Sequence, residues 1–421
     1  MTYLRQTVSV LRRKPVLYWA LYDWANSAFA TTVMAGFFPI FFKQYWSVGN
    51  ASLSTFRLGV ANSVVGFVLA VLSPILGAMA DRGHSRLRFL FGFTLLGVTA
   101  SATLFAIEQG AWQWAVLVYI TASIGFWGGL IFYDALLLDV APSNQLDLVS
   151  GFGYGMGYLG GGLLFALNVW MTLQPQVFGL ANAASAIRVS FVMVALWWGL
   201  FSIPLFIGTK ESTPVNKQPL SQLVKSAFLE LRNTFRELRH FRALGIFLLA
   251  YWLYIDGVNT VIKMAIDYGL SLGFTTSSLI VALLIVQFVG FPAALIFGWL
   301  GNRYSTLGGI LLGIGVYVAV TLYAVFMNEV ADFYYLAIAI GLVQGAVQSL
   351  SRSWFAARVP TERAGEFFGF FNMMGKFASV LGPALMGVAA MLVGNRYSIL
   401  SLLILFLMGG ALLVRAHREP R

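Results

Sequence analysis

Long apolar stretches recur along the whole chain, separated by short polar segments or by segments rich in proline and glycine. There are twelve, near residues 16–46, 56–80, 88–108, 112–140, 148–173, 186–208, 243–270, 276–300, 305–327, 332–358, 365–393 and 396–415. A run of about 20 apolar residues is long enough for an α-helix to cross a bilayer. The strands of a membrane β-barrel are only about 10 residues long and alternate apolar with polar positions. The pattern therefore predicts an all-α membrane protein with twelve transmembrane helices.

The composition agrees with a protein that is surrounded by lipid. Hydrophobic residues make up 59% of the 421 residues and charged residues 10%, against about 25% charged residues in soluble proteins. So few charges could not cover the surface of a soluble protein of this size. The sequence contains no cysteine, which excludes disulfides, thiol catalysis and thiolate–metal sites. We expect neither a metal nor a cofactor.

The basic residues predict the orientation of the helices. With the N-terminus inside the cell, the outer side receives only Lys43, Arg57, Arg188 and Arg396, and the other basic residues outside the spans fall on the cytoplasmic side. Because cytoplasmic loops carry the excess of lysine and arginine, we expect both termini in the cytoplasm. The net charge of +11 then reflects topology and contact with anionic inner-leaflet lipids, not a nucleic-acid partner. We expect a multi-pass protein of a bacterial inner membrane, present as a monomer.

The longest connection, residues 209–242, divides the chain into an N-terminal six-helix bundle (1–208) and a C-terminal one (243–421). Within it, apolar residues from Leu220 to Leu238 recur at helical spacing with Lys225, Arg232 and other basic residues between them. This pattern is typical of a basic amphipathic helix that lies on the inner leaflet. A calmodulin-like target segment is the alternative.

The two halves resemble each other. The motifs that recur in the same order are Asp23-x-x-Asn26 as Asp256-x-x-Asn259, Gly77-Ala-Met-Ala-Asp81-Arg82 as Gly298-Trp-Leu-Gly-Asn302-Arg303, and Gly151-Phe152-x-Tyr154-x-Met156-Gly157-Tyr158 as Gly369-Phe370-x-Asn372-x-Met374-Gly375-Lys376. The offsets are 221 residues (298 − 77) for the second motif and 218 (369 − 151) for the third. Parallel repeats of six spans describe the two halves of a major-facilitator transporter.

Several motifs also resemble known families. Gly77-x-x-x-Asp81-Arg82-Gly83-x-x-Arg86-x-Arg88 resembles the signature loop of the major facilitator superfamily, although His84-Ser85 replaces the usual basic residue after Gly83. The motifs that resemble the vacuolar amino-acid effluxer-like branch are Tyr22-Asp23-Trp24-Ala25-Asn26-Ser27-Ala28-Phe29, Gln348-Ser-Leu-Ser-Arg352-Ser353 and Phe368-Gly-Phe-Phe-Asn372-Met-Met-Gly-Lys376. The resemblance implies a transporter whose helices one, four, seven and ten surround a central cavity. The best-known members of this branch are linked to amino-acid export from the vacuole.

Charges inside the predicted helices mark candidate functional residues, because each costs about 2.5–3.5 kcal/mol at the bilayer centre. The clearest are Asp23, Asp134, Asp256, Lys263, Arg352 and Lys376. Helical spacing extends them into polar faces, which include Asp23 with Asn26, Asp256 with Asn259, Lys263 and Asp267, and Gln344 with Gln348 and Arg352. Three polar faces on one axis predict a water-filled site near the midplane of the membrane.

Depth separates two roles. Asp256 and Lys376 lie about 17–20 Å from the cytoplasmic ends of their helices, and Asp23, Asp134 and Arg352 about 9–12 Å. We therefore predict a substrate site formed by Asp256, Asn259, Lys376, Asn372, Gln344, Gln348, Asn26, Tyr154 and Tyr158. The residues that we assign to gating or coupling are Asp23, Asp134, Arg352, Gly77, Asp81, Arg82 and Asp139.

Three contacts follow from this assignment. Arg352 is expected to pair with Asp134 or Asp23 when the cavity opens outward, a static interhelix pair being the alternative. Asp81 is expected to dock at the N-terminus of the helix that starts near Gly365, where the helix dipole favours an anion. Arg82 is expected to reach Asp139.

These features predict a secondary active transporter that moves a small polar or zwitterionic solute, an amino acid as the best choice, by alternating access. All three histidines fall in cytoplasmic loops, so proton coupling would need a membrane carboxylate, with Asp256, Asp134 and Asp23 as candidates. The alternatives are an exporter of amphipathic drugs or lipids and a membrane sensor that binds a ligand without translocation. A membrane-embedded enzyme is disfavoured, because the loops are short and the buried charges lie at the centre.

Overall fold

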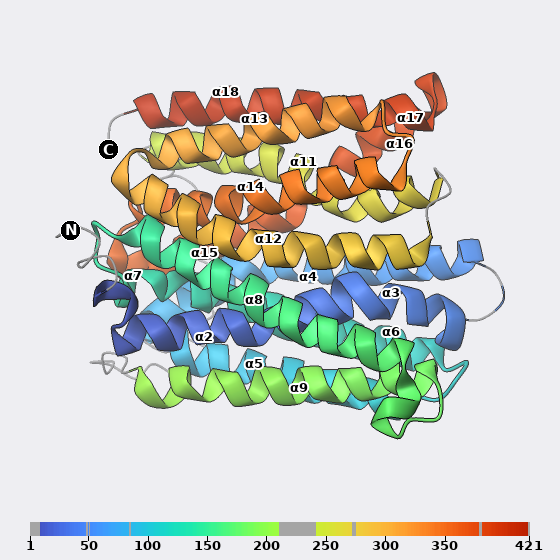
Figure 1. The fold of residues 1–421 in the computed structure, drawn as a ribbon. Helices are drawn as coiled ribbons and strands as arrows, with labels where there is room; N and C mark the ends of the chain where they lie inside the picture. The colour runs from blue at the N-terminus through green and yellow to red at the C-terminus, as the bar shows by residue number, and fades with distance from the viewer. Residues whose placement is uncertain are drawn as a thin grey trace.

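The computed structural model describes residues 9–47, 49, 51–83, 86–209, 241–271, 275–378 and 381–419. Throughout these residues the fold is a bundle of long helices (Figure 1). Twelve helical stretches in the described ranges are long and apolar enough to cross a membrane, which confirms the predicted number of spans. They are Lys14–Trp46, Leu53–Asp81, Arg86–Ala106, Trp112–Val140, Leu146–Leu173, Ala183–Gly208, Arg242–Ile262, Ser277–Arg303, Thr306–Ala324, Val330–Ala356, Thr361–Val393 and Arg396–Arg418.

The first six spans form the N-terminal half. Its helices are α2 (Lys14–Ala28), α3 (Phe38–Phe41), α4 (Ala51–Gly83), α5 (Arg86–Thr103), α6 (Trp112–Ala135), α7 (Leu137–Val140), α8 (Leu146–Leu173) and α9 (Ala183–Gly208). The first span is less regular than predicted, because π-helical turns at Phe29–Phe37 and Phe42–Trp46 flank α3. Pro39 lies in α3 and has no N–H for the helical ladder, which favours such an interruption.

The last six spans form the C-terminal half. Its helices are α11 (Arg242–Ser271), α12 (Thr276–Arg303), α13 (Thr306–Ala324), α14 (Val330–Ala356), α15 (Ala364–Phe377), α16 (Leu381–Val393), α17 (Asn395–Ser398) and α18 (Leu402–Arg418). The predicted span 365–393 is two helices, since the backbone leaves the helical conformation at Ala378 with ψ at 60°. Pro383 is placed in the first turn of α16, where its missing N–H leaves no hydrogen bond unmade.

Both halves meet along two helix pairs, α8 with α12 and α4 with α15. Glycine permits this close approach: a Cβ on Gly77 would overlap the carbonyl of Gly365, and a Cβ on Gly151 would lie 2.7 Å from the Cα of Gly298. The first helix of the N-terminal half begins, and the last helix of the C-terminal half ends, at one end of the bundle (Figure 1). We call this the termini end, and the opposite end, where α4 begins at Ala51, the far end.

Some of the predictions concern residues that the structure does not describe. Residues 210–240 are outside the described ranges, so the amphipathic helix expected in 209–242 stays a prediction. The side chains of Arg82, Lys263 and Asp267 also fall outside the description.

Candidate functional site

Arg352 of α14 lies at the centre of a polar cluster between the two halves, and only 2% of its surface is exposed. Its Nη1 is 3.0 Å from Oδ1 of Asp134 on α6. Its Nε and Nη2 donate to the hydroxyl and the carbonyl of Ser150 on α8, at 3.0 and 3.1 Å. The predicted contact of Arg352 with Asp134 is therefore present. Because Arg352 belongs to the C-terminal half and both partners to the N-terminal half, this contact joins the halves.

Aromatic rings enclose the guanidinium. The rings of Trp19, Tyr133 and Tyr154 have their centres 4.8, 5.5 and 4.5 Å from its central carbon. Aromatic faces attract a cation, and the attraction strengthens when water is excluded. Tyr154, predicted to bind substrate, is thus a packing partner of Arg352 in this conformation.

The two carboxylates of the cluster differ in their partners. Asp134 accepts from Arg352 on one oxygen and from Nδ2 of Asn372, 3.1 Å away, on the other. Asp23 accepts a 3.1 Å hydrogen bond from the hydroxyl of Tyr133. Arg352 therefore forms its ion pair with Asp134, and Asp23 is hydrogen-bonded to Tyr133.

Lys376 lies one helical turn beyond Asn372 on α15. Its ammonium group is placed over the ring of Trp127 on α6, so this contact also crosses between the halves. Lys376, Gln344 and Gln348 are all half-buried. Gln348 and Lys376 lie about one helical turn, and Gln344 about two turns, farther from the termini end than Arg352 and Asn372.

Asp256 and Asn259, which we predicted to bind substrate, contact the backbone where the eleventh span is interrupted. Both carboxylate oxygens of Asp256 accept backbone N–H groups at the start of α16, from Leu381 and Gly382 at 2.9 Å each. The amide of Asn259 donates to the carbonyl of Ala378, at the end of α15, over 2.6 Å. Asp256 is fully buried, so it offers no surface to a ligand here. In this conformation the motif satisfies the backbone groups left by the interruption of the eleventh span, as a helix cap does.

Two further predicted substrate ligands are also buried. Asn26 is 1% exposed in the interior of the N-terminal half. Tyr158 packs its ring against α12 at Gly290 and α14 at Gly345, where an added Cβ would come within 3.0 and 2.7 Å of it. Tyr158 therefore fills the contact between the halves instead of facing an open site.

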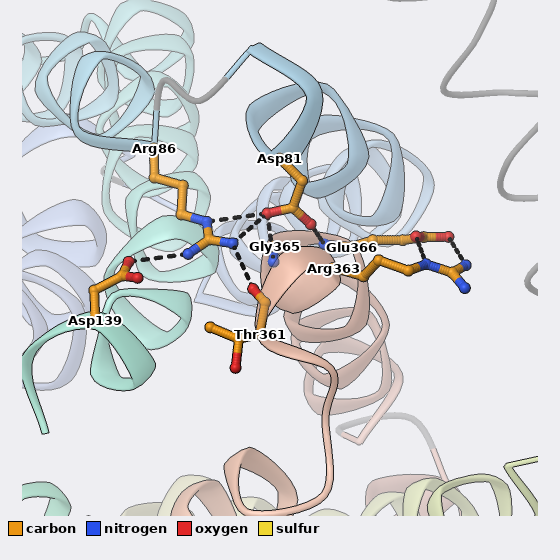
Figure 2. A network of polar contacts seen from close by, with 7 residues as sticks. All are labelled: Asp81, Arg86, Asp139, Thr361, Arg363, Gly365 and Glu366. Atoms are coloured by element: carbon orange, nitrogen blue, oxygen red, sulfur yellow. Dashed lines mark hydrogen bonds and ion pairs between the residues drawn. The ribbon is translucent and has the colours of Figure 1, made fainter. Parts of the chain in front are cut away.

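The signature motif forms a second contact between the halves at the termini end (Figure 2). Asp81, near the end of α4, accepts the backbone N–H groups of Gly365 and Glu366 at 2.9 and 2.8 Å. These are the first residues of α15, where the helix dipole favours an anion. The predicted docking of Asp81 at this helix start is confirmed. Gly77 is one turn away, at the position where a Cβ would overlap the backbone of α15.

Arg86 completes this contact (Figure 2). It lies between Asp81 and Asp139, 2.7 and 2.9 Å from their oxygens, and it donates to the carbonyl of Thr361 at 3.2 Å. We predicted Arg82 as the partner of Asp139, and the structure gives this position to Arg86. Arg86 was already part of the quoted motif, which was the signal that could have identified it.

Two further contacts between the halves were also not predicted. Asp147, in the first turn of α8, accepts from the hydroxyl of Thr306 at 2.6 Å and from that of Ser353. Gln287 of α12 donates to the hydroxyl of Thr31 in the first span at 2.5 Å. Asp147 was passed over because it stands at a predicted helix end, where a charge costs little. The offset of 218 residues between the repeats, which carries 147 to Gly365, was an available signal.

The helix α4 shows how far the contact between the halves extends. At the termini end Ala78 and Ala80 are buried and α15 packs against the helix. At the far end Phe56 is 67% and Phe67 71% exposed. The helix that continues α15 toward the far end is α16, and it packs on α11, α17 and α18 of its own half. Along α4, α15 and α16 the contact between the halves is therefore confined to the termini end, whereas α12 also packs on the N-terminal half near its own start, at Ile280, Leu283 and Leu284.

Comparison with known proteins identifies the family. Residues 58–419 match the profile of the family described as "Vacuole effluxer Atg22 like". The chain is 40% identical to the uncharacterized MFS-type transporter YxiO of Bacillus subtilis (strain 168) over 405 residues, which cover 95% of this chain and 94% of that one. The chain belongs to the Atg22-like branch of the major facilitator superfamily. It is therefore a multi-pass membrane transporter and not an enzyme.

More distant relatives agree with this assignment. Autophagy-related protein 22 of Cryptococcus neoformans var. neoformans serotype D (strain B-3501A) is 28% identical over 68% of this chain and 58% of its own length. The fold is similar to that of the human organic anion transporter MFSD10, with a TM-score of 0.74 at 13% identity over 95% of this chain and 99% of that one. It is also similar to FucP in the outward conformation, with a TM-score of 0.67 at 13% identity over 98% and 100%. The predicted major-facilitator fold is confirmed.

Proposed function

We propose that this transporter exports a small zwitterionic solute, an amino acid as the best choice, by alternating access. Members of a superfamily of secondary transporters share its fold, and the name of its family refers to efflux. The cluster between the halves carries both signs of charge, on Asp23 and Asp134 and on Arg352 and Lys376. This observation supports the proposal, because a zwitterion needs one partner of each sign.

The geometry divides these charges into two pairs. Arg352 and Asp134 neutralise each other and are closed off by aromatic rings. Lys376 is half-buried on α15, and Asp23 accepts from a single tyrosine hydroxyl. In our proposal Lys376 receives the carboxylate of the substrate, Asp23 receives its ammonium group, and Gln344 and Gln348 bind its polar atoms.

The conformation fits an outward-open carrier. The basic residues predict that the termini end faces the cytoplasm, and this is the end at which Asp81, Arg352 and Asp147 join the halves. We propose that inward opening separates Arg352 from Asp134, which makes this pair a gate. The proposal also includes a bacterial plasma membrane as the location, anionic lipids at the inner leaflet and a monomeric protein.

For coupling, Asp23 is the proposed proton carrier. A carboxylate that gains and loses a proton in each cycle must not be held by several donors. Asp134 is held by Arg352 and Asn372, and Asp256 by two backbone N–H groups. Asp23 has the fewest such constraints among these three, so we place it first, ahead of the residues that the sequence ranked above it.

An apolar substrate is the second candidate. Phe56, Val60, Val64 and Phe67 line one exposed face of α4 at the far end. This face would suit an amphipathic drug or lipid that is released there. It is equally suited to acyl chains of the membrane, so it carries less weight than the paired charges.

Purified protein tests these assignments. We expect an amino acid to raise the unfolding temperature and to exchange across proteoliposomes that contain the protein. Lys376→Met and Asp23→Asn should each lower exchange at least about tenfold. Glu108→Gln, which removes an exposed carboxylate outside this cluster, is the matched control and should exchange like the parent. Exchange of apolar cations but not of amino acids would favour the second candidate, and binding without exchange would indicate a sensor.

A further inference from the structure

The termini end carries a second carboxylate that reaches from one half to the other. Asp147 belongs to the first turn of α8 and is 8% exposed. Its oxygens accept the hydroxyls of Thr306, the first residue of α13, and of Ser353 on α14. Both donors belong to the C-terminal half. This contact is separate from the Asp81 contact, which joins α4 to α15.

The internal repeat relates these two contacts. The offset of 218 residues carries Asp147 to Gly365 (147 + 218), so both contacts involve the start of equivalent helices, α8 and α15. The offset of 221 carries Asp81 to Asn302 (81 + 221). In the contact with α15, the acid is Asp81, at the end of the second span. In the contact at the start of α8, the position equivalent to Asp81 is Asn302, and the acid is Asp147, on the fifth span.

A neighbouring glycine leaves room for the carboxylate of Asp147. Gly301 stands where the first repeat has Ala80, and a Cβ there would lie 3.1 Å from Oδ2 of Asp147 and 2.6 Å from a methyl group of Leu350. The absence of a side chain at Gly301 therefore leaves room for the carboxylate. Asp147 also lies in the first turn of its own helix, where the helix dipole stabilises a negative charge.

We infer that Asp147, like Asp81, forms a contact that holds the termini end closed. In this contact the acid lies on the fifth span, whereas in the Asp81 contact it lies on the second span. Opening this end must separate Asp147 from Thr306 and Ser353, because they belong to different halves. The hydrogen bonds to the charged oxygen then favour the closed state, and water replaces them in the open state. Asp147 thereby helps to set the balance between the two states of the transporter, whatever its substrate.

The cysteine-free sequence makes this inference testable without a substrate. Ser349 is fully buried, and its carbonyl accepts the hydroxyl of Ser150 across the boundary between the halves. Ser349→Cys therefore provides a single thiol that a maleimide reaches when the termini end opens. We expect Asp147→Asn to raise the labelling rate about tenfold, and Thr306→Val or Ser353→Ala about threefold. The double variant Asp147→Asn with Thr306→Val should label no faster than Asp147→Asn alone, since both changes remove one contact.

Glu108→Gln is the matched control, because it removes one exposed carboxylate outside this contact and should leave the labelling rate unchanged. Equal labelling of the parent, Asp147→Asn and Thr306→Val would overturn the inference, as would slower labelling of Asp147→Asn. If Asp147→Asn does not elute as a folded monodisperse protein, the two hydroxyl variants decide. Because the readout needs no substrate, its failure leaves the proposed amino-acid export untouched, and a failed transport assay leaves this inference untouched.

Discussion

The two ends of the bundle are held in different ways. At the termini end, charged and backbone groups cross from one half to the other: Asp81 with the start of α15, Asp147 with Thr306, and Arg352 with Asp134. At the far end, α4 turns apolar side chains outward, α16 packs within its own half, and α12 meets the N-terminal half through apolar residues such as Leu283 and Leu284. Water can replace hydrogen bonds when a contact opens, so the net contribution of each hydrogen bond to a charged group is only about 1.5–3 kcal/mol. Polar contacts therefore suit a joint that must open and close repeatedly.

Removal of the central cation should have the largest effect. Arg352→Ala leaves the carboxylate of Asp134 buried without its counter-charge, which costs about 3–5 kcal/mol when one partner of a buried pair is lost. We expect a lower unfolding temperature in detergent and loss of transport in proteoliposomes.

Arg396→Ala is the matched variant at the far end. Arg396 donates to the carbonyls of Val325 and Met327 and to the side-chain oxygen of Asn328, all within its own half, so its loss should cost about 1.5–3 kcal/mol and leave transport in place. If Arg352→Ala transported like the parent, Arg352 would be neither a gate nor a required part of the cluster.

A pair of glycines on α4 compares the two ends directly. A Cβ on Gly77 overlaps the carbonyl of Gly365, whereas one on Gly59 meets no atom within 4 Å. Gly77→Ala should therefore push α4 from α15 and destabilise the protein by about 1–3 kcal/mol. The thiol of Ser349→Cys should react faster in this variant because the termini end is held less tightly.

Gly59→Ala should stabilise the helix slightly, by less than about 1 kcal/mol, and leave the labelling rate unchanged. Equal labelling rates for the two alanine variants would mean that α4 and α15 do not have to approach this closely in the closed state.

The sequence was sufficient for features that depend on local pattern. Hydrophobic run length predicted the twelve spans, and the similar depth of Arg352, Asp134 and Asp23 in their helices predicted an ion pair of Arg352 with one of the two acids. Docking of Asp81 at Gly365 followed from the helix dipole. The interruption of the eleventh span was missed, because residues 365–393 form one continuous apolar run and only Pro383 marks a change. Without that interruption, Asp256 and Asn259 looked like unpartnered polar groups and were assigned to a ligand.

Arg86 and Asp147 were missed for a different physical reason. Both lie at helix ends, where water is near and a charge in the sequence carries little information. Both residues form hydrogen bonds with the opposite half: Arg86 with the carbonyl of Thr361, and Asp147 with the hydroxyl of Ser353. Contacts of this kind depend on how two bundles dock, and no local pattern specifies that.

The last two variants change carboxylates that each cap one of the two helices of the eleventh span. Asp81 caps α15 from the other half, and Asp256 caps α16 from its own half. Asp256→Asn should cost about 1–3 kcal/mol, because it leaves one buried backbone N–H without its acceptor, and should lower the unfolding temperature without a change in the labelling of Ser349→Cys. Asp81→Asn should raise that labelling, because its contact must break when the termini end opens. Faster labelling in Asp256→Asn would show that α16 takes part in the opening of this end, and the polar contacts between the halves would then not be its only control.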